Sequence, residues 1–205
     1  MSSSPLLFTY RRCPYAMRAR MALLQAGVVY QAHELTSLRA KPAEMLAVSP
    51  KGTVPVLVLP TGEILEQSLD IMQWAFALTG DPDGWWARAQ TDVHRSLLAT
   101  CDGDFKHHLD RYKYPQRFSD AQGLEHHRTK AVSVLLESLE SALKDSAYLG
   151  GATPCAADIG IFPFVRQFAA INPDWFQNLP LPAVKAWLAV WLEHPLFQAA
   201  MVKTQ

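Results

Sequence analysis

Short apolar runs alternate with helical patterns over the first 80 residues of the chain. Period-two runs rich in Val, Leu and aromatic residues predict strands, and apolar positions spaced by three or four residues predict helices. Helices are expected to begin at Pro14, at Pro42 and after Gln67, and Gly27 is expected to end the first. The predicted strands are residues 5–10, 28–33, 54–59 and 63–66. This part therefore predicts an α/β arrangement in the order βαβαββα.

The pattern changes at Gly80-Asp81-Pro82-Asp83-Gly84, a segment dense in turn residues, and everything after it predicts helices. Strands and helices followed by helices alone predict an α/β domain joined to an all-α domain. The expected division is a first domain at 1–80, a linker at 81–87 and an all-helical domain at 88–205. The later helices are predicted at 85–112, at 121–145, from Cys155 with an interruption at Pro163, and at 183–193.

Composition excludes several classes of protein. Nineteen basic and nineteen acidic residues cancel, so no overall field attracts nucleic acid or an anionic membrane. No apolar run reaches membrane-spanning length, and the N-terminus lacks the pattern of a signal peptide. Three cysteines are too few and too unevenly spaced for a disulfide framework. We therefore expect a soluble cytoplasmic protein with partners other than nucleic acid or membranes.

Cys13 is the first candidate for chemistry, because it lies between the first strand and the first helix. Pro14 suits the first helical turn, which places Cys13 at or beside the N-cap. Thiols at helix N-termini have pKa values lowered to roughly 3.5–7.5, and the thiolate is the reactive form. The alternative for an isolated cysteine is an inert buried residue. The position of Cys13 favours the reactive thiol.

Three further features are weak one by one. Pro55 interrupts a predicted central strand, so it is either an edge-strand proline or part of a cis Val54-Pro55 bond that leaves the Val54 backbone free to pair with a peptide ligand. Gln67-Ser68 begins a helix whose first amides attract a carboxylate, although every helix start has this property. Lys41 is a loop lysine that either binds an anion or is only solvated.

Together, Cys13-Pro14-Tyr15-Ala16, Thr53-Val54-Pro55-Val56-Leu57 and Gln67-Ser68 resemble the glutathione transferase superfamily in order and spacing. The resemblance covers nearly the whole chain. It implies a thioredoxin-like glutathione-binding domain followed by a helical domain. Cys13 stands where other members have Tyr or Ser. This cysteine, together with Lys41-Pro42, makes the chain similar to the omega-like cysteine-type members, including two-domain glutaredoxins.

The resemblance also implies residue roles. Cys13 faces the glutathione sulfur and is the catalytic residue, and Pro55 is the cis proline. Gln67 stands where omega-type proteins commonly have Glu, and a neutral amide loses the charge-assisted part of that contact with the ligand ammonium. The residues expected to bind glutathione are Lys41, Val54, Pro55, Gln67 and Ser68.

Ala16 decides the expected subtype of chemistry, because a Cys-x-x-Cys pair is absent. We expect a monothiol route through a glutathionyl-Cys13 intermediate, with glutathione as cosubstrate and little conjugation of aryl halides. The expected partner is a small-molecule electrophile or a glutathionyl mixed disulfide. The alternatives are a conventional conjugating transferase and a non-catalytic regulator of the stringent-starvation type. The family also implies a homodimer.

Other polar and aromatic residues are expected to have ordinary roles. His107-His108 and His126-His127 lack the i, i+4 spacing of helical metal ligands, so surface histidines and no metal are expected. Asp158, three residues after Cys155, predicts a structural capping box weakened by the thiol. Family-like placement alone suggests residues for the cosubstrate pocket, namely Tyr15, Phe105, His108 and Tyr112.

Overall fold

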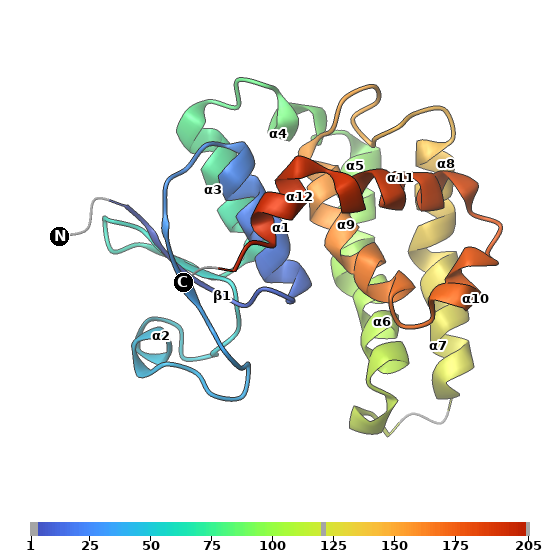
Figure 1. The fold of residues 1–205 in the computed structure, drawn as a ribbon, viewed down its shortest axis with the longest axis horizontal. Coiled ribbons are helices and arrows are strands. Elements are labelled where there is room, and N and C mark those ends of the chain that lie inside the picture. Colours follow the sequence, from blue (N-terminus) through green and yellow to red (C-terminus); the bar gives the residue numbers. More distant parts are fainter. Residues whose placement is uncertain (1–3, 120–121, 204–205) are drawn as a thin grey trace. The chain divides into compact units, whose positions relative to one another are not determined.

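The computed structural model describes residues 4–119 and 122–203. They form two compact units. Unit 1 comprises the chain up to Gly84 together with the segment from Glu193 onward, and unit 2 comprises Trp85–Leu192. Figure 1 shows the elements of both units coloured along the sequence.

Unit 1 contains a four-stranded mixed sheet in the order β2-β1-β3-β4. β1 pairs in parallel with β2, with Leu6 opposite Gln31, and antiparallel with β3, with Phe8 opposite Val56. β3 pairs antiparallel with β4. The elements in chain order are β1 (Leu6–Thr9), α1 (Pro14–Gln25), β2 (Gln31–Glu34), α2 (Ala43–Val48), β3 (Val56–Val58), β4 (Ile64–Leu65) and α3 (Ser68–Thr79). The predicted βαβαββα order is therefore confirmed.

The alternation of side chains along β1 divides the core of unit 1 into two clusters. Leu7 belongs to a cluster that also holds Leu23 of α1 and Ile71 of α3. Phe8, the next residue, belongs to a second cluster with Met45 of α2. Successive side chains of a strand point to opposite faces, so helices cover both faces of the sheet, as in thioredoxin-like folds. Gly80, with φ +73°, ends α3 in the left-handed conformation.

Unit 2 is helical apart from an isolated bridge between Tyr148 and Gly151 in the described part of the chain. Two of its long helices contain a π-helical segment, and in both cases the chain continues without a break. The elements are α4 (Trp85–Arg88), α5 (Asp92–Thr100), η1 (Cys101–Phe105), α6 (Lys106–Lys113), η2 (Pro115–Arg117), α7 (Gly123–Ala131), η3 (Val132–Leu136), α8 (Glu137–Leu143), α9 (Ala156–Ala169), α10 (Pro173–Gln177) and α11 (Pro182–Glu193). The predicted fold class, thioredoxin-like followed by all-helical, is confirmed.

The structure corrects several predicted bounds. The second strand begins at Gln31, not at residue 28, because the preceding Val29 is 80% exposed and does not pair. The helix predicted at 85–112 is divided at Thr91, whose side chain accepts a hydrogen bond from the His94 amide and starts α5. Pro163 does not interrupt its helix, since α9 continues through it with the proline fully packed in the core. Residue 121, the predicted start of another helix, lies outside the described residues.

The last helix was not predicted. α12 (Pro195–Ala200) packs against α1 in unit 1, although it follows α11 after a single residue (Figure 1). The expected end of the first domain at residue 80 and the expected start of the helical domain at residue 88 remain predictions. In the part of the chain that the structure describes, no helix combines the length and apolar character needed to cross a membrane.

Candidate active site

Cys13 occupies the N-cap of α1, as the sequence predicts. Its backbone is extended, with φ −77° and ψ 123°, and Pro14 fills the first helical position. The Cys13 amide donates to the Tyr10 carbonyl at 3.0 Å, which fixes the turn between β1 and α1. The partly buried thiol therefore lies at the positive end of the α1 dipole, which favours a thiolate.

The Val54-Pro55 segment faces this thiol. Their peptide bond is cis, as the resemblance implied, and both residues are buried just before β3. The Cys13 Sγ lies 3.8 Å from the Val54 carbonyl oxygen, within hydrogen-bond range for sulfur. Two segments separated by 41 residues thus bring the thiol and the Val54 backbone together.

Gln67 and Ser68 begin α3. Gln67 is the exposed N-cap residue, and Ser68 is buried at 3% exposure. The Ser68 Oγ accepts a hydrogen bond of 2.8 Å from Nε of the buried Arg18 on α1. This contact joins the start of α3 to α1 five residues after Cys13, and the sequence analysis assigned Arg18 no such position. The signal available in the sequence was an arginine on a helix face that also carries Pro14 and Ala22, four residues before and after it.

Lys41 is exposed in the loop before α2, and its side chain lies over Gly52. A Cβ atom on Gly52 would stand 2.9 Å from the Lys41 Cδ and 3.2 Å from its Nζ. Gly52 also has φ +60°, a conformation that glycine adopts without strain. The glycine therefore brings the Lys41 ammonium close to the segment that leads into Val54.

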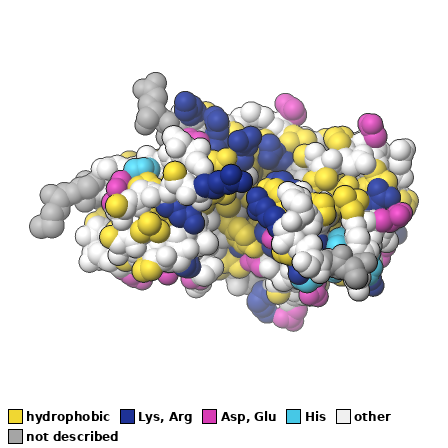
Figure 2. Space-filling model, turned by 90° about the horizontal axis from the view of Figure 1, so that it is seen from below, with side chains coloured by type: hydrophobic (Ala, Val, Ile, Leu, Met, Phe, Trp, Pro, Cys, Tyr) yellow, Lys and Arg dark blue, Asp and Glu magenta, His cyan; other side chains and the backbone are white. Residues whose placement is uncertain are grey.

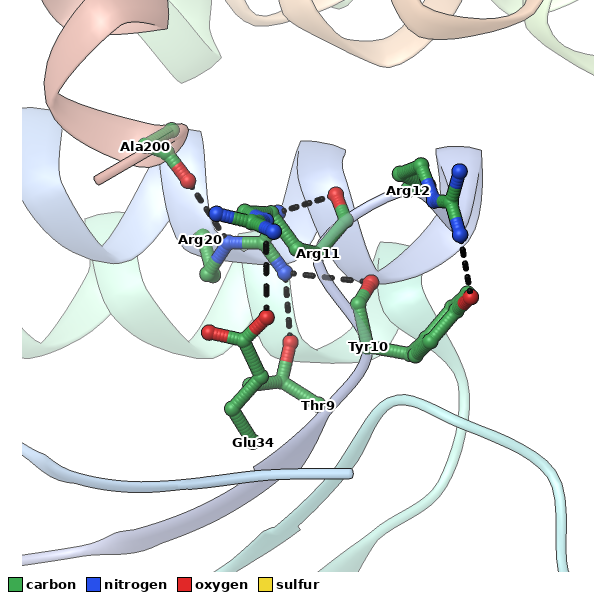
Figure 3. A network of polar contacts seen from close by, with 7 residues as sticks. All are labelled: Thr9, Tyr10, Arg11, Arg12, Arg20, Glu34 and Ala200. Atoms are coloured by element: carbon green, nitrogen blue, oxygen red, sulfur yellow. Dashed lines mark hydrogen bonds and ion pairs between the residues drawn. The ribbon is translucent and has the colours of Figure 1, made fainter. Parts of the chain in front are cut away.

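A buried arginine that the sequence analysis did not single out anchors the loop before Cys13. Arg20 Nη1 donates to Thr9 Oγ1 at 2.6 Å, and Nη2 donates to the Arg11 carbonyl at 2.7 Å (Figure 3). Its Nε donates to the Ala200 carbonyl at 2.9 Å. Burial lowers the pKa of Arg20, while Tyr30, Glu34 and Cys13 oppose this shift electrostatically. Arg20 therefore places positive charge within electrostatic reach of the thiol.

The suggested cosubstrate residues fall in different environments. Tyr15 is partly buried in unit 1, with the Arg18 guanidinium 5.1 Å from its ring centroid. Phe105 and Tyr112 are buried in unit 2 and both contact Phe168. The burial of Phe105 and Tyr112 favours a role in packing the core of unit 2. Their place in a cosubstrate pocket remains a prediction.

His108, the fourth suggested residue, is partly buried and faces the ring of His127. Burial lowers the pKa of His108, and the neighbouring histidines lower it further against a smaller effect of Asp104. The expectation that all four histidines lie at the surface is wrong for His127, which is 2% exposed. Spacing along one helix could not reveal this burial, because α7 packs against α6, where the His127 ring meets the His108 ring.

The other two cysteines are fully buried, and the three cysteines, all in the described part of the chain, form no disulfide. Burial raises the pKa of the Cys155 thiol to about 12, with Asp158 contributing. Asp158 accepts hydrogen bonds from the amides of Leu149 and Cys155 and from Trp187 Nε1, at 2.8 to 2.9 Å. Both residues therefore have the structural role that the sequence predicts.

Known proteins share both the sequence pattern and the fold. Residues 7–83 match the family described as glutathione S-transferase, N-terminal domain, and residues 122–189 match glutathione S-transferase, C-terminal domain. A probable glutathione S-transferase of Zea mays is 27% identical, over 94% of this chain and 88% of its own. The maleylacetoacetate isomerase of Pseudomonas aeruginosa is 25% identical, over 95% of this chain and 94% of its own.

Solved structures show the same fold. A glutathione transferase from Pseudomonas putida, with one glutathione disulfide bound per subunit, has a TM-score of 0.79 at 20% identity, covering 99% of this chain and 93% of its own. A glutathione transferase family member from Pseudomonas fluorescens, with two glutathione molecules bound, has a TM-score of 0.77 at 20% identity, covering 97% and 92%. With the two family matches spanning most of the chain, the protein belongs to the glutathione S-transferase superfamily of transferases.

Proposed function

We propose that the protein is a glutathione-dependent thiol transferase of the cysteine type, which removes glutathione from mixed disulfides through Cys13. The observation that carries the proposal is the placement of this thiol at the N-cap of α1, 3.8 Å from the Val54 carbonyl. A Tyr or Ser hydroxyl at this place would only stabilise a bound glutathione thiolate. A cysteine can itself form a bond to sulfur.

The proposed glutathione site surrounds Cys13 within unit 1. The Val54 backbone pairs with the cysteinyl part of glutathione, and an extended peptide ligand gains affinity from such main-chain hydrogen bonds. Gln67 and Ser68 hold the γ-glutamyl end at the start of α3, where free amides and the helix dipole favour a carboxylate. Lys41, which lies over Gly52, meets the glycyl carboxylate.

The proposed reaction has two exchange steps. First, the Cys13 thiolate attacks the glutathionyl sulfur of a mixed disulfide; the Cys13–glutathione bond forms, the bond to the substrate sulfur breaks, and the substrate leaves as a thiolate that takes a proton from water. Second, a glutathione thiolate attacks the Cys13–glutathione disulfide, forms glutathione disulfide and releases the Cys13 thiolate. Buried Ala16 replaces any second thiol, so glutathione itself must complete the cycle.

Two exclusive outcomes distinguish this function from conventional conjugation. Purified protein is assayed with a glutathionyl mixed disulfide and, separately, with an aryl halide, using the unchanged chain, Cys13→Ser and Cys13→Ala. We expect turnover of the mixed disulfide that Cys13→Ser loses, with slow conjugation of the halide. Rapid halide conjugation that persists in Cys13→Ala would contradict the proposal and support a conjugating transferase.

A matched control uses the buried thiol. Cys101→Ala removes a cysteine of unit 2 that is fully buried, so it should leave the mixed-disulfide rate unchanged. The absence of glutathione binding in calorimetry would instead favour a non-catalytic member of the fold. The chemistry requires a reducing compartment such as the cytoplasm, and we propose a homodimer on the basis of the family.

A further inference from the structure

Four histidine rings come together on two neighbouring helices of unit 2. His107 and His108 lie on α6, and His126 and His127 lie on α7. The helices pack side by side, and the Nδ1 atoms of His108 and His127 are 2.8 Å apart. Figure 2 shows histidine side chains reaching the surface of the molecule. The proposed thiol chemistry gives these rings no role, apart from the suggested place of His108 in a cosubstrate pocket.

Three of the rings bring nitrogen atoms close enough together to hold one metal ion. His107, His108 and His127 each offer one ring nitrogen, and these atoms lie within 4.8 Å of one another. Zinc–nitrogen bonds of 2.0–2.1 Å in a tetrahedral site place nitrogen ligands about 3.4 Å apart. The 2.8 Å separation of the His108 and His127 Nδ1 atoms is shorter than this spacing, and the 4.8 Å bound on the three ligand atoms is longer, so small side-chain rotations would bring the nitrogens to ligand spacing.

The three histidines combine a buried ligand with one that solvent can reach, as a metal site open to solvent requires. His127 is 2% exposed on a packed helix, which fixes one ligand, and His108 is partly buried beside it. His107 is exposed, so an ion can reach the cluster from solvent and keep water as a further ligand. The side chain of His126 lies next to the same rings, with its centroid 5.2 Å from that of His127.

The hydrogen bonds of the cluster already orient lone pairs. An arginine can only donate, so the 3.1 Å contact from Arg111 Nη1 shows that His107 Nδ1 is an acceptor, and a metal ion bound there would take the place of the Arg111 donor. Between His108 and His127, the 2.8 Å contact needs one proton shared by two Nδ1 atoms. A metal ion bound to both Nδ1 atoms takes the place of this proton, which moves to the Nε2 atom of the same ring, so both imidazoles stay neutral ligands. Asp104 adds a negative charge that acts on His108.

We infer that His107, His108 and His127 form a binding site for one divalent transition-metal ion, such as Zn²⁺, which links α6 to α7. Neutral imidazole is a good ligand for Zn²⁺, Ni²⁺ and Cu²⁺. The ion stabilises the pairing of the two helices, because it binds the folded arrangement and not the unfolded chain.

The test is calorimetric titration of ZnCl₂ into the full chain, prepared without a histidine tag and treated with a chelator. All proteins carry Cys13→Ser, because the partly buried Cys13 thiol would otherwise compete for zinc. We expect one Zn²⁺ per chain, with affinity reduced about tenfold or more in His107→Ala and in His108→Ala. His33→Ala is the matched control, since His33 pairs with the Glu44 carboxylate on unit 1, outside the cluster, and its loss should leave the affinity unchanged.

The inference is overturned if ZnCl₂ gives no saturable binding, or if His107→Ala binds as tightly as its parent. His107 is exposed, so its variant keeps the fold even if the His108 variant does not. Thermal unfolding supplies a second readout. Zinc should raise the Tm of the parent and of His33→Ala, and it should leave that of His107→Ala nearly unchanged. An equal rise in all three proteins also contradicts the site.

Discussion

At the scale of single residues, the three cysteines carry the same thiol group in two kinds of environment. Cys13 is partly buried at a helix N-terminus, whereas Cys101 and Cys155 are enclosed in the core. The pKa of the Cys155 thiol is raised to about 12 by burial, so this thiol stays protonated at neutral pH. Reactivity toward disulfides depends on the thiolate, and environment therefore selects Cys13.

This contrast predicts the thiol stoichiometry. At pH 8, a thiol-specific reagent should modify one cysteine per native chain and three after unfolding in urea. Native Cys13→Ser should show no rapid reaction, because the remaining thiols are buried. Rapid modification of two or more thiols in the native protein would contradict the assignment.

Gly52 provides a second prediction at this scale. A substitution there strains the left-handed backbone and also displaces Lys41, and a comparison with Gly27 distinguishes the two effects. Gly52→Ala and Gly27→Ala should each lower the free energy of unfolding by about 1–2 kcal/mol, since both positions have positive φ. Only Gly52→Ala displaces Lys41, as the space around Gly27 is open. Calorimetry should show weaker glutathione binding for Gly52→Ala alone, and equal binding by the two variants would remove Lys41 from the site.

At the scale of elements, the sequence predicted a helix correctly where the residues that start or end it lie close together in the chain. Cys13-Pro14 predicted the start of α1, and Asp158 predicted the start of α9. Gly80 lies where the helix α3 ends. Pro163 misled the prediction, because a proline inside a helix usually disrupts it, whereas packing on all sides keeps α9 continuous. The burial of His127 depends on a second helix, and no pattern in α7 alone could reveal it.

Asp158 links elements that are far apart in the chain, and this gives a prediction at the element scale. Its carboxylate accepts from the turn at Leu149, from the N-cap of α9 and from Trp187 on α11. Asp158→Ala leaves these buried donors without their acceptor and should lower the free energy of unfolding by about 3 kcal/mol or more. Urea unfolding measures this loss. Asp92→Ala, at a carboxylate 98% exposed, should change it by less than about 0.5 kcal/mol.

At the scale of the whole molecule, unit 1 is built from both ends of the chain. Arg20 connects them, because its guanidinium binds the β1 region and its Nε donates to the Ala200 carbonyl at the end of α12 (Figure 3). The sequence predicted neither this contact nor α12 itself. A short helix separated from α1 by 170 residues leaves no local signal of where it will pack.

Arg20→Lys tests this connection. Lysine keeps the charge but cannot reproduce several fixed hydrogen bonds, so the free energy of unfolding should fall by about 2–3 kcal/mol. Reaction of Cys13 with glutathione disulfide should also slow, because the loop before it loses its anchor. Arg12→Lys is the stability control, since exposed Arg12 contacts only the Tyr10 hydroxyl among the contacts drawn in Figure 3. Equal stability of the two variants would contradict the structural role of Arg20.

The central claim is that Cys13 forms a covalent glutathionyl intermediate, and mass spectrometry of the intact protein tests it most directly. After incubation with glutathione disulfide, the unchanged chain should gain one glutathionyl group, which added glutathione then removes. Cys13→Ser should gain none, and Cys101→Ala should behave as the unchanged chain. No adduct on the unchanged chain, or the same adduct on Cys13→Ser, would contradict the account.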